Sequence, residues 1–176
     1  LVGIRKRNRA SNEAAMKYVI NGGIGTAITL FGMSYLYGIT GSTNIVEMQK
    51  VFTQGLAGGI QLLLALAFLL LLVGLSFKIA TVPFHMWAPD VYEGAATPVT
   101  AFLGTISKIA GFLLITRLFL MVFAGVAIQG DAQSLYGRMS IYIAVLASIT
   151  MIVGNVVALK QYNVKRLFAY SGIAHA

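Results

Sequence analysis

The stretch VFTQGLAGGIQLLLALAFLLLLVGLSFKIATVPFHMWAPDVYEGA, residues 51–95, decides how this chain folds. Its first 27 residues carry no charge, and an apolar run of about 18 residues or more can cross a bilayer as a helix. The apolar region from about residue 58 to 92 would reach roughly 50 Å as one helix, well past a hydrocarbon core of roughly 30 Å. Pro83 has no N–H to donate to the carbonyl of Ile79. We therefore predict a discontinuous helix that breaks between Ile79 and Pro83.

The composition of the whole chain is that of a membrane protein. Of its 176 residues, 58% are apolar and 10% are charged, none is cysteine, and the mean hydropathy is +0.82. Soluble domains carry about 25% charged residues. Residues 18–46 and 139–159 form two further uncharged runs of 29 and 21 residues. The predicted fold class is an all-α, polytopic bundle of transmembrane helices, which excludes a soluble enzyme, a disordered tail and a disulfide scaffold.

The basic residues indicate how the predicted spans are oriented. Four spans are expected, over residues 12–37, 58–92, 99–126 and 139–160. The links at residues 5–9 and 160–166 hold seven Lys and Arg residues, whereas those at residues 38–54 and 129–138 hold two. Four spans place the two basic links on the same side, and the positive-inside rule assigns that side to the cytoplasm. We expect the more polar residues 44–54 to form a short connection.

Two lysines fall within predicted spans, where charge is costly. Lys78 lies just before the helix break and Lys108 about ten residues into the third span. A single charge at mid-depth costs roughly 2.5–3.5 kcal/mol on insertion scales, so each lysine needs a partner. Two lysines facing a common interior would each make proton release easier for the other, which suits a proton relay. The alternative is a structural role, as static ion pairs or bonds to backbone carbonyls.

Four other titratable residues are secondary candidates. His175 lies about 12 residues past the second basic link, and histidine titrates near neutral pH. His85 follows the break, where an interfacial or capping role is favoured. Glu13 and Lys17 have the i,i+4 spacing and order that stabilise a helix, so they form either a surface ion pair or a functional one.

The residues around the second link have simpler interpretations. Trp87 and Tyr92 are typical of aromatic residues at a membrane interface. Asp90 and Glu93 are expected to cap a helix or to form ion pairs in the link. None of these four residues is predicted to take part in proton transfer.

The sequence contains no pattern that would hold a cofactor, a metal or a nucleic acid. Two histidines and scattered carboxylates do not suggest a metal site, and without cysteine no thiolate can bind an iron–sulfur cluster. No glycine-rich nucleotide fingerprint or Walker lysine occurs. The net charge of +8 gathers mostly at the ends of apolar runs, where it sets topology, so a nucleic-acid partner is not expected.

Several motifs carry a resemblance to a known family. The run FKIATVPFHMWAPDVYEGA, with TPV, SKIA, KRLFAYS and NEAAMKY elsewhere in the chain, closely resembles the antiporter-like subunit N of bacterial NADH:quinone oxidoreductase, respiratory complex I. The wider superfamily includes multi-subunit sodium/proton antiporters and shares a K…P…W.PDA pattern. The PFH and VYEG variants point to subunit N.

The resemblance implies a subunit of 14 helices, and we expect residues 1–176 to be an internal fragment of its single antiporter-like domain, from the end of helix 5 to the start of helix 10. Lys78 matches the lysine of the discontinuous helix 7, and Lys108 matches the relay lysine of helix 8. Glu13 and Lys17 match charged positions at the start of helix 6. His175 matches a position in helix 10 to which we assign no role.

The same resemblance implies the function. The subunit would act as a translocase in the bacterial cell (inner) membrane, passing protons through Lys78, Lys108 and internal water, next to other membrane subunits of complex I. NADH, FMN, the iron–sulfur clusters and quinone would belong to other subunits, with no redox site in this chain. Two alternatives remain: a subunit of a cation/proton antiporter, and a membrane scaffold that moves no ions.

Overall fold

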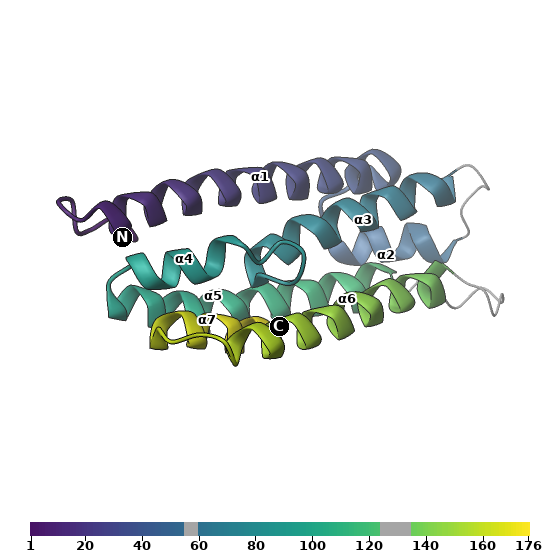
Figure 1. The fold of residues 1–176 in the computed structure, drawn as a ribbon. Coiled ribbons are helices and arrows are strands. Elements are labelled where there is room, and N and C mark those ends of the chain that lie inside the picture. The colour runs from purple at the N-terminus through teal and green to yellow at the C-terminus, as the bar shows by residue number, and fades with distance from the viewer. Residues whose placement is uncertain (55–59, 124–134) are drawn as a thin grey trace.

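The computed structural model describes residues 1–54, 60–123 and 135–176, and these ranges contain helices and turns without a strand. Four helical stretches are long and apolar enough to cross a membrane: Arg9–Thr40, Leu62–Ile79, Thr97–Phe123 and Met139–Ala158. They run side by side along one axis (Figure 1). The predicted all-α bundle with four spans is confirmed.

The elements follow the predicted order, and a short helix is added between the first two spans. They are α1 (Arg9–Thr40), α2 (Ile45–Thr53), α3 (Ile60–Ile79), α4 (Trp87–Gly94), α5 (Thr97–Leu118), a five-residue π-helical turn η1 (Phe119–Phe123), α6 (Leu135–Ala158) and α7 (Val164–Ala174). The polar loop expected at residues 129–138 falls mostly outside the described residues, and α6 already begins at Leu135.

The predicted helix break is confirmed at the end of α3. The helix stops at Ile79, and Ala80 takes a left-handed backbone conformation with φ of 60°. The Thr81 N–H then donates to the Ser76 carbonyl at 3.1 Å, which is the six-to-one hydrogen bond of a Schellman ending. An irregular segment that contains Pro83 follows, and α4 continues the region toward the next link.

The short connection expected at residues 44–54 is mostly the helix α2, which was not predicted from the sequence. The Asn44 side chain caps this helix by accepting a hydrogen bond from the Val46 N–H at 3.0 Å. Met48 and Phe52 lie one turn apart and are both buried against α1, α3 and η1. Apolar residues at this spacing form one face, and packing of that face stabilises a helix too short to persist alone.

Two clusters of buried apolar side chains hold the bundle together. The first surrounds α4 and includes Val91, Tyr92 and Ile173; the second lies at the other end, around Leu64 and Phe68. Only 4% of Tyr92 is exposed, so it does not face lipid, and its expected depth at a membrane interface stays a prediction. Tyr92 is instead a core residue between α4 and α5, because the short α4 is covered by α1, α5 and α7.

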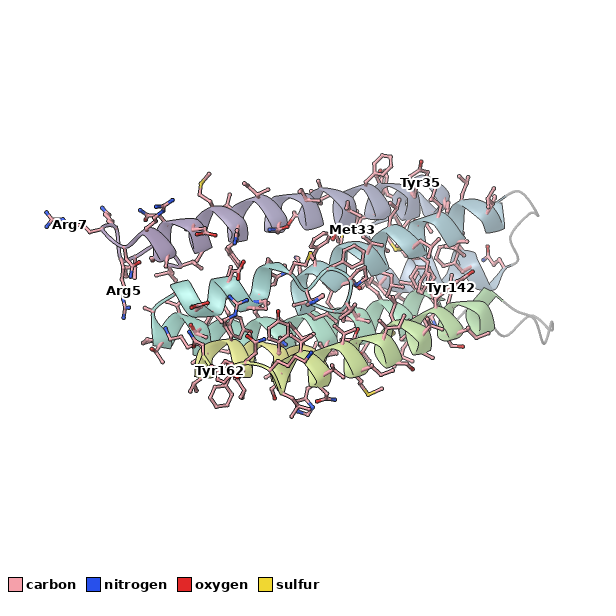
Figure 2. The ribbon with its side chains drawn as sticks, in the orientation of Figure 1. Arg5, Arg7, Met33, Tyr35, Tyr142 and Tyr162 are labelled. Atoms are coloured by element: carbon pink, nitrogen blue, oxygen red, sulfur yellow. The ribbon has the colours of Figure 1, made fainter. Side chains whose placement is uncertain are left out.

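The two basic links lie at the same end of the bundle, as predicted. Arg5, Arg7 and Tyr162 gather at one end, whereas Tyr35 and Tyr142 lie toward the other (Figure 2). Much of the second basic link is helical, because α7 begins at Val164 and is capped by the Asn163 side chain. The structure contains no membrane, so which side this end faces stays a prediction.

Candidate functional site

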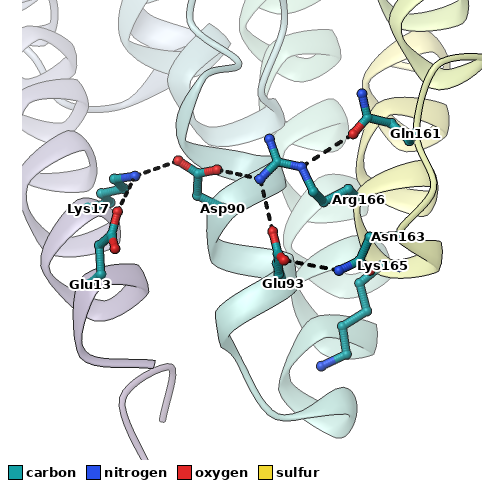
Figure 3. A network of polar contacts seen from close by, with 8 residues as sticks. All are labelled: Glu13, Lys17, Asp90, Glu93, Gln161, Asn163, Lys165 and Arg166. Atoms are coloured by element: carbon teal, nitrogen blue, oxygen red, sulfur yellow. Dashed lines mark hydrogen bonds and ion pairs between the residues drawn. The ribbon is translucent and has the colours of Figure 1, made fainter. Parts of the chain in front are cut away.

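A charge cluster joins three helices at the end of the bundle that carries the basic links (Figure 3). It consists of Glu13, Lys17, Asp90, Glu93 and Arg166. Lys17 Nζ on α1 lies 2.7 Å from Glu13 Oε1 and 2.6 Å from Asp90 Oδ2 on α4. Arg166 Nη1 on α7 lies 2.9 Å from both Asp90 Oδ1 and Glu93 Oε2. Asp90 therefore bridges α1 and α7 through the half-helix between them.

Neutral groups support the Arg166 side of the charge cluster. Asn163 donates to Glu93 Oε1 at 3.0 Å, and Arg166 Nε donates to Gln161 Oε1 at 3.3 Å. The hydrogen bond to Glu93 is the largest of the contributions that raise the pKa of Arg166, so the guanidinium stays charged. The i,i+4 pair was predicted from sequence, and of the two alternatives for Asp90 and Glu93, capping or ion pairing, the structure shows ion pairing. The participation of Arg166 was missed, although its basic link was expected on the same side.

Lys78 lies in the last turn of α3 and lines a pocket of about 720 Å³, which we call the Lys78 pocket. Tyr18 of α1, Trp87 of α4 and Ser107 of α5 also line it, and small residues of α1 such as Gly22 form much of its wall. Among the residues that the structure describes, Lys78 makes no hydrogen bond or ion pair. Its ammonium is therefore a cation beside a hollow large enough for several water molecules.

Lys108 has different surroundings. It is half-buried on α5, and its Nζ donates a short hydrogen bond to the Gly172 carbonyl of α7. No hydrogen bond joins Lys108 to Lys78 within the described ranges. The structure thus places Lys78 on the pocket between α1, α3, α4 and α5, and Lys108 against α7. Their joint role in a relay stays a prediction.

Trp87 connects the pocket to the end of α3. Its indole Nε1 donates to the Phe77 carbonyl at 3.0 Å, and its ring meets the Tyr18 ring edge-on with centroids 5.6 Å apart. The expectation that Trp87 lies at a membrane interface did not include these contacts. The end of a broken helix leaves carbonyls that need a hydrogen-bond donor, and Trp87 follows that end closely in the chain. This short spacing is the signal that could have predicted the contact.

Neither histidine lines the Lys78 pocket. His85 stands in the broken segment with its ring 6.4 Å from that of Tyr170, and its buried Nδ1 has no hydrogen-bond partner among the described atoms. Thr81 Oγ1 is a second buried atom of this kind. His175 ends α7, where its backbone N–H donates to the Ser171 carbonyl at 3.1 Å and its side chain is exposed. The roles of His85 and His175 in proton transfer stay predictions.

The described residues contain no group of three His, Cys, Asp or Glu side chains that could hold a metal ion. The chemistry that this region can support is the movement of protons between lysines, carboxylates and water. The groups that could take part are the charge cluster at the end of the bundle and Lys78 beside its pocket.

Comparison with known proteins agrees with the motifs. The profile of the family described as "NADH:quinone oxidoreductase/Mrp antiporter, TM" matches residues 1–176. The chain is 93% identical over its full length to NADH-quinone oxidoreductase subunit N of Bacillus anthracis and 61% identical to that of Geobacillus sp. (strain WCH70). It spans 35% and 36% of these two relatives. The predicted resemblance to subunit N is confirmed.

Solved structures share the fold. A chain of respiratory complex I from Thermus thermophilus matches with a TM-score of 0.69 and 38% identity, over 96% of this chain and 33% of that one. A chain of an archaeal membrane-bound sulfane sulfur reductase matches with a TM-score of 0.80 and 28% identity, over 99% of this chain and 33% of that one. A chain of the Mrp complex from Dietzia sp., at 23% identity and a TM-score of 0.77, has a similar fold.

Proposed function

Since this chain belongs to the transmembrane family of NADH:quinone oxidoreductase and Mrp antiporter subunits, we propose that it forms part of a proton-translocating subunit of an NADH:quinone oxidoreductase. The identity of 93% to subunit N of Bacillus anthracis supports this assignment. The chain would supply about a third of that subunit, from the end of helix 5 to the start of helix 10. NADH oxidation and quinone reduction, with FMN and the iron–sulfur clusters, would take place on other subunits.

The observation that carries the proposal is the position of Lys78. An ammonium in the last turn of a broken membrane helix faces a pocket of about 720 Å³ and has no partner among the described side chains. Broken helices within membranes are tolerated where they line a wet cavity or lie buried in protein. A lysine held there can exchange its proton with water when nearby charge changes, which a permanently paired lysine does less readily.

Lys108 would receive the proton from Lys78 through water and pass it toward α7. The Gly172 carbonyl accepts from its ammonium and would hold it in place between transfers. The end with the basic links would face the cytoplasm of a bacterial cell, and the bundle would contact lipid and other membrane subunits of the complex.

Two other functions compete with this one. The family also contains Mrp antiporter subunits, so exchange of a cation for protons without any redox partner is the first alternative. In the second, the chain is a scaffold and both lysines are static, as the Lys108–Gly172 bond favours for that residue. Sodium movement without NADH oxidation would support the antiporter.

The test is respiration-driven proton uptake into inverted membrane vesicles that carry the full-length subunit with Lys78→Ala. We expect uptake to be lost in a complex that still assembles. Lys160→Ala is the matched control, because Lys160 is an exposed lysine at the end of the bundle. Normal uptake in the Lys78→Ala complex would return the scaffold to the leading interpretation.

A further inference from the structure

The Phe77 carbonyl in the last turn of α3 accepts a hydrogen bond from outside the helix. In the Schellman ending, the Thr81 N–H takes the Ser76 carbonyl, and the next carbonyl belongs to Phe77. Trp87 Nε1 donates to that carbonyl at 3.0 Å from across the break. Phe77 directly precedes Lys78 in the chain. The indole therefore fixes the backbone from which the Lys78 side chain projects.

The same indole lines the Lys78 pocket. Trp87 and Tyr18 both line the pocket, and their rings pack edge to face. In sequence, Tyr18 directly follows Lys17, and Trp87 precedes Asp90 by one helical turn. Lys17 and Asp90 form the ion pair of 2.6 Å between α1 and α4. The two aromatic rings thus stand on the two helices that this ion pair joins.

We propose that Trp87 is a positioning residue for Lys78: its ring is packed on Tyr18, and its indole N–H holds the Phe77 carbonyl in the turn of α3 from which Lys78 projects. The importance of this positioning for proton transfer rests on the proposed function. Without the N–H, the last turn of α3 frays and Lys78 changes its orientation.

Thiol labelling tests the positioning directly. Lys78→Cys is introduced into the full-length subunit in its assembled complex, and membrane vesicles of either orientation are treated with a charged, membrane-impermeant maleimide. The labelling of the same complex without the new cysteine is subtracted as background. We expect Trp87→Phe to raise the labelling rate roughly three- to tenfold, because a frayed last turn of α3 exposes the thiol more often and loss of one ordinary hydrogen bond changes an equilibrium by that factor.

Two further variants separate the N–H from the bulk of the ring. Benzothienylalanine at position 87 keeps the shape of tryptophan and lacks only the N–H, so it should raise labelling as Trp87→Phe does. Tyr18→Phe keeps the packed ring, and the Tyr18 hydroxyl has no hydrogen bond among the described residues, so it should leave labelling unchanged. The parent rate in both position-87 variants would overturn the proposal, and so would an equal rise in Tyr18→Phe.

A second readout separates this inference from the proposed function. In complexes that retain Lys78, the pH profile of NADH-driven proton uptake should shift in Trp87→Phe, since the frayed turn presents the ammonium to the pocket in a different orientation. Raised labelling with an unshifted profile would keep Trp87 as the positioning residue and remove Lys78 from proton transfer. An unshifted profile with the parent labelling rate would overturn the positioning role and leave the Lys78→Ala test standing.

Discussion

The cations of the charge cluster are paired with carboxylates, whereas the lysine of the Lys78 pocket has no ion pair among the described residues. At the end of the bundle, Lys17 and Arg166 each contact two carboxylates at 2.6–2.9 Å, and neutral side chains complete the set. Beside the pocket, Lys78 contacts no charged or hydrogen-bonding group among the described residues. A paired charge fixes helices relative to one another, whereas an unpaired charge beside a hollow can respond to its surroundings. The first region holds the half-helix α4 between α1 and α7, and the second leaves an ammonium without an ionic partner among the described residues.

The largest expected effect comes from forcing apart the helices under the charge cluster. A Cβ at Gly94 would lie 2.4 Å from the Ala10 carbonyl oxygen and 2.6 Å from Ala14 Cβ. Gly94→Ala should therefore separate α1 from α4 and lower the free energy of unfolding by about 3 kcal/mol, the upper end of ordinary overpacking costs. Thermal unfolding of the subunit in detergent measures the change.

The control for this prediction is Gly38→Ala. A Cβ at Gly38 meets nothing within 4 Å, and alanine is the better helix former. A loss of stability in Gly38→Ala as large as in Gly94→Ala would show that the close approach of α1 and α4 is not the cause.

The next effect comes from removing the bridge itself. Asp90→Asn should lower the free energy of unfolding by about 2 kcal/mol, because Lys17 and Arg166 lose the carboxylate that they share in a partly buried site. The loss should shrink as salt is added, since screening weakens the same ion pairs in the parent protein. Equal losses at low and high salt would contradict an ionic role for Asp90.

The two lysines give a smaller and more pointed contrast. Lys108→Met should cost about 1 kcal/mol, because it leaves the Gly172 carbonyl without its donor. Lys78→Met should cost nothing measurable, because no partner among the described residues is lost and methionine keeps much of the side-chain volume. Chemical unfolding of the two variants side by side would decide, and a greater loss in Lys78→Met would mean that Lys78 is structurally paired.

The smallest effect is expected at the rim of the charge cluster. Glu13 is 60% exposed in its pair with Lys17, and Lys17 keeps Asp90 when Glu13 is neutral. Glu13→Gln should lower the free energy of unfolding by about 0.3–0.5 kcal/mol, as for exposed i,i+4 pairs. A loss comparable to that of Asp90→Asn, measured in the same unfolding assay, would place Glu13 at the centre of the charge cluster instead.

Local patterns in the sequence were enough for the course of the chain. Three uncharged runs and the apolar residues around Lys108 predicted the four spans, Pro83 predicted the break after Ile79, and the i,i+4 spacing predicted the Glu13–Lys17 pair. These features depend on residues close together in the chain, so no tertiary knowledge was needed. The helix α2 was missed because its apolar face gains stability only when Met48 and Phe52 pack on other helices.

The partners of each charge were decided by the tertiary structure alone. Asp90 reaches Lys17 and Arg166 across 73 and 76 residues of sequence, and Lys108 reaches Gly172 across 64. Such contacts depend on the rotation and height of separate helices, which packing between them sets. Hydropathy and spacing thus determined that a lysine stands beside a broken membrane helix, whereas the arrangement of α1, α4 and α5 left that lysine facing a pocket.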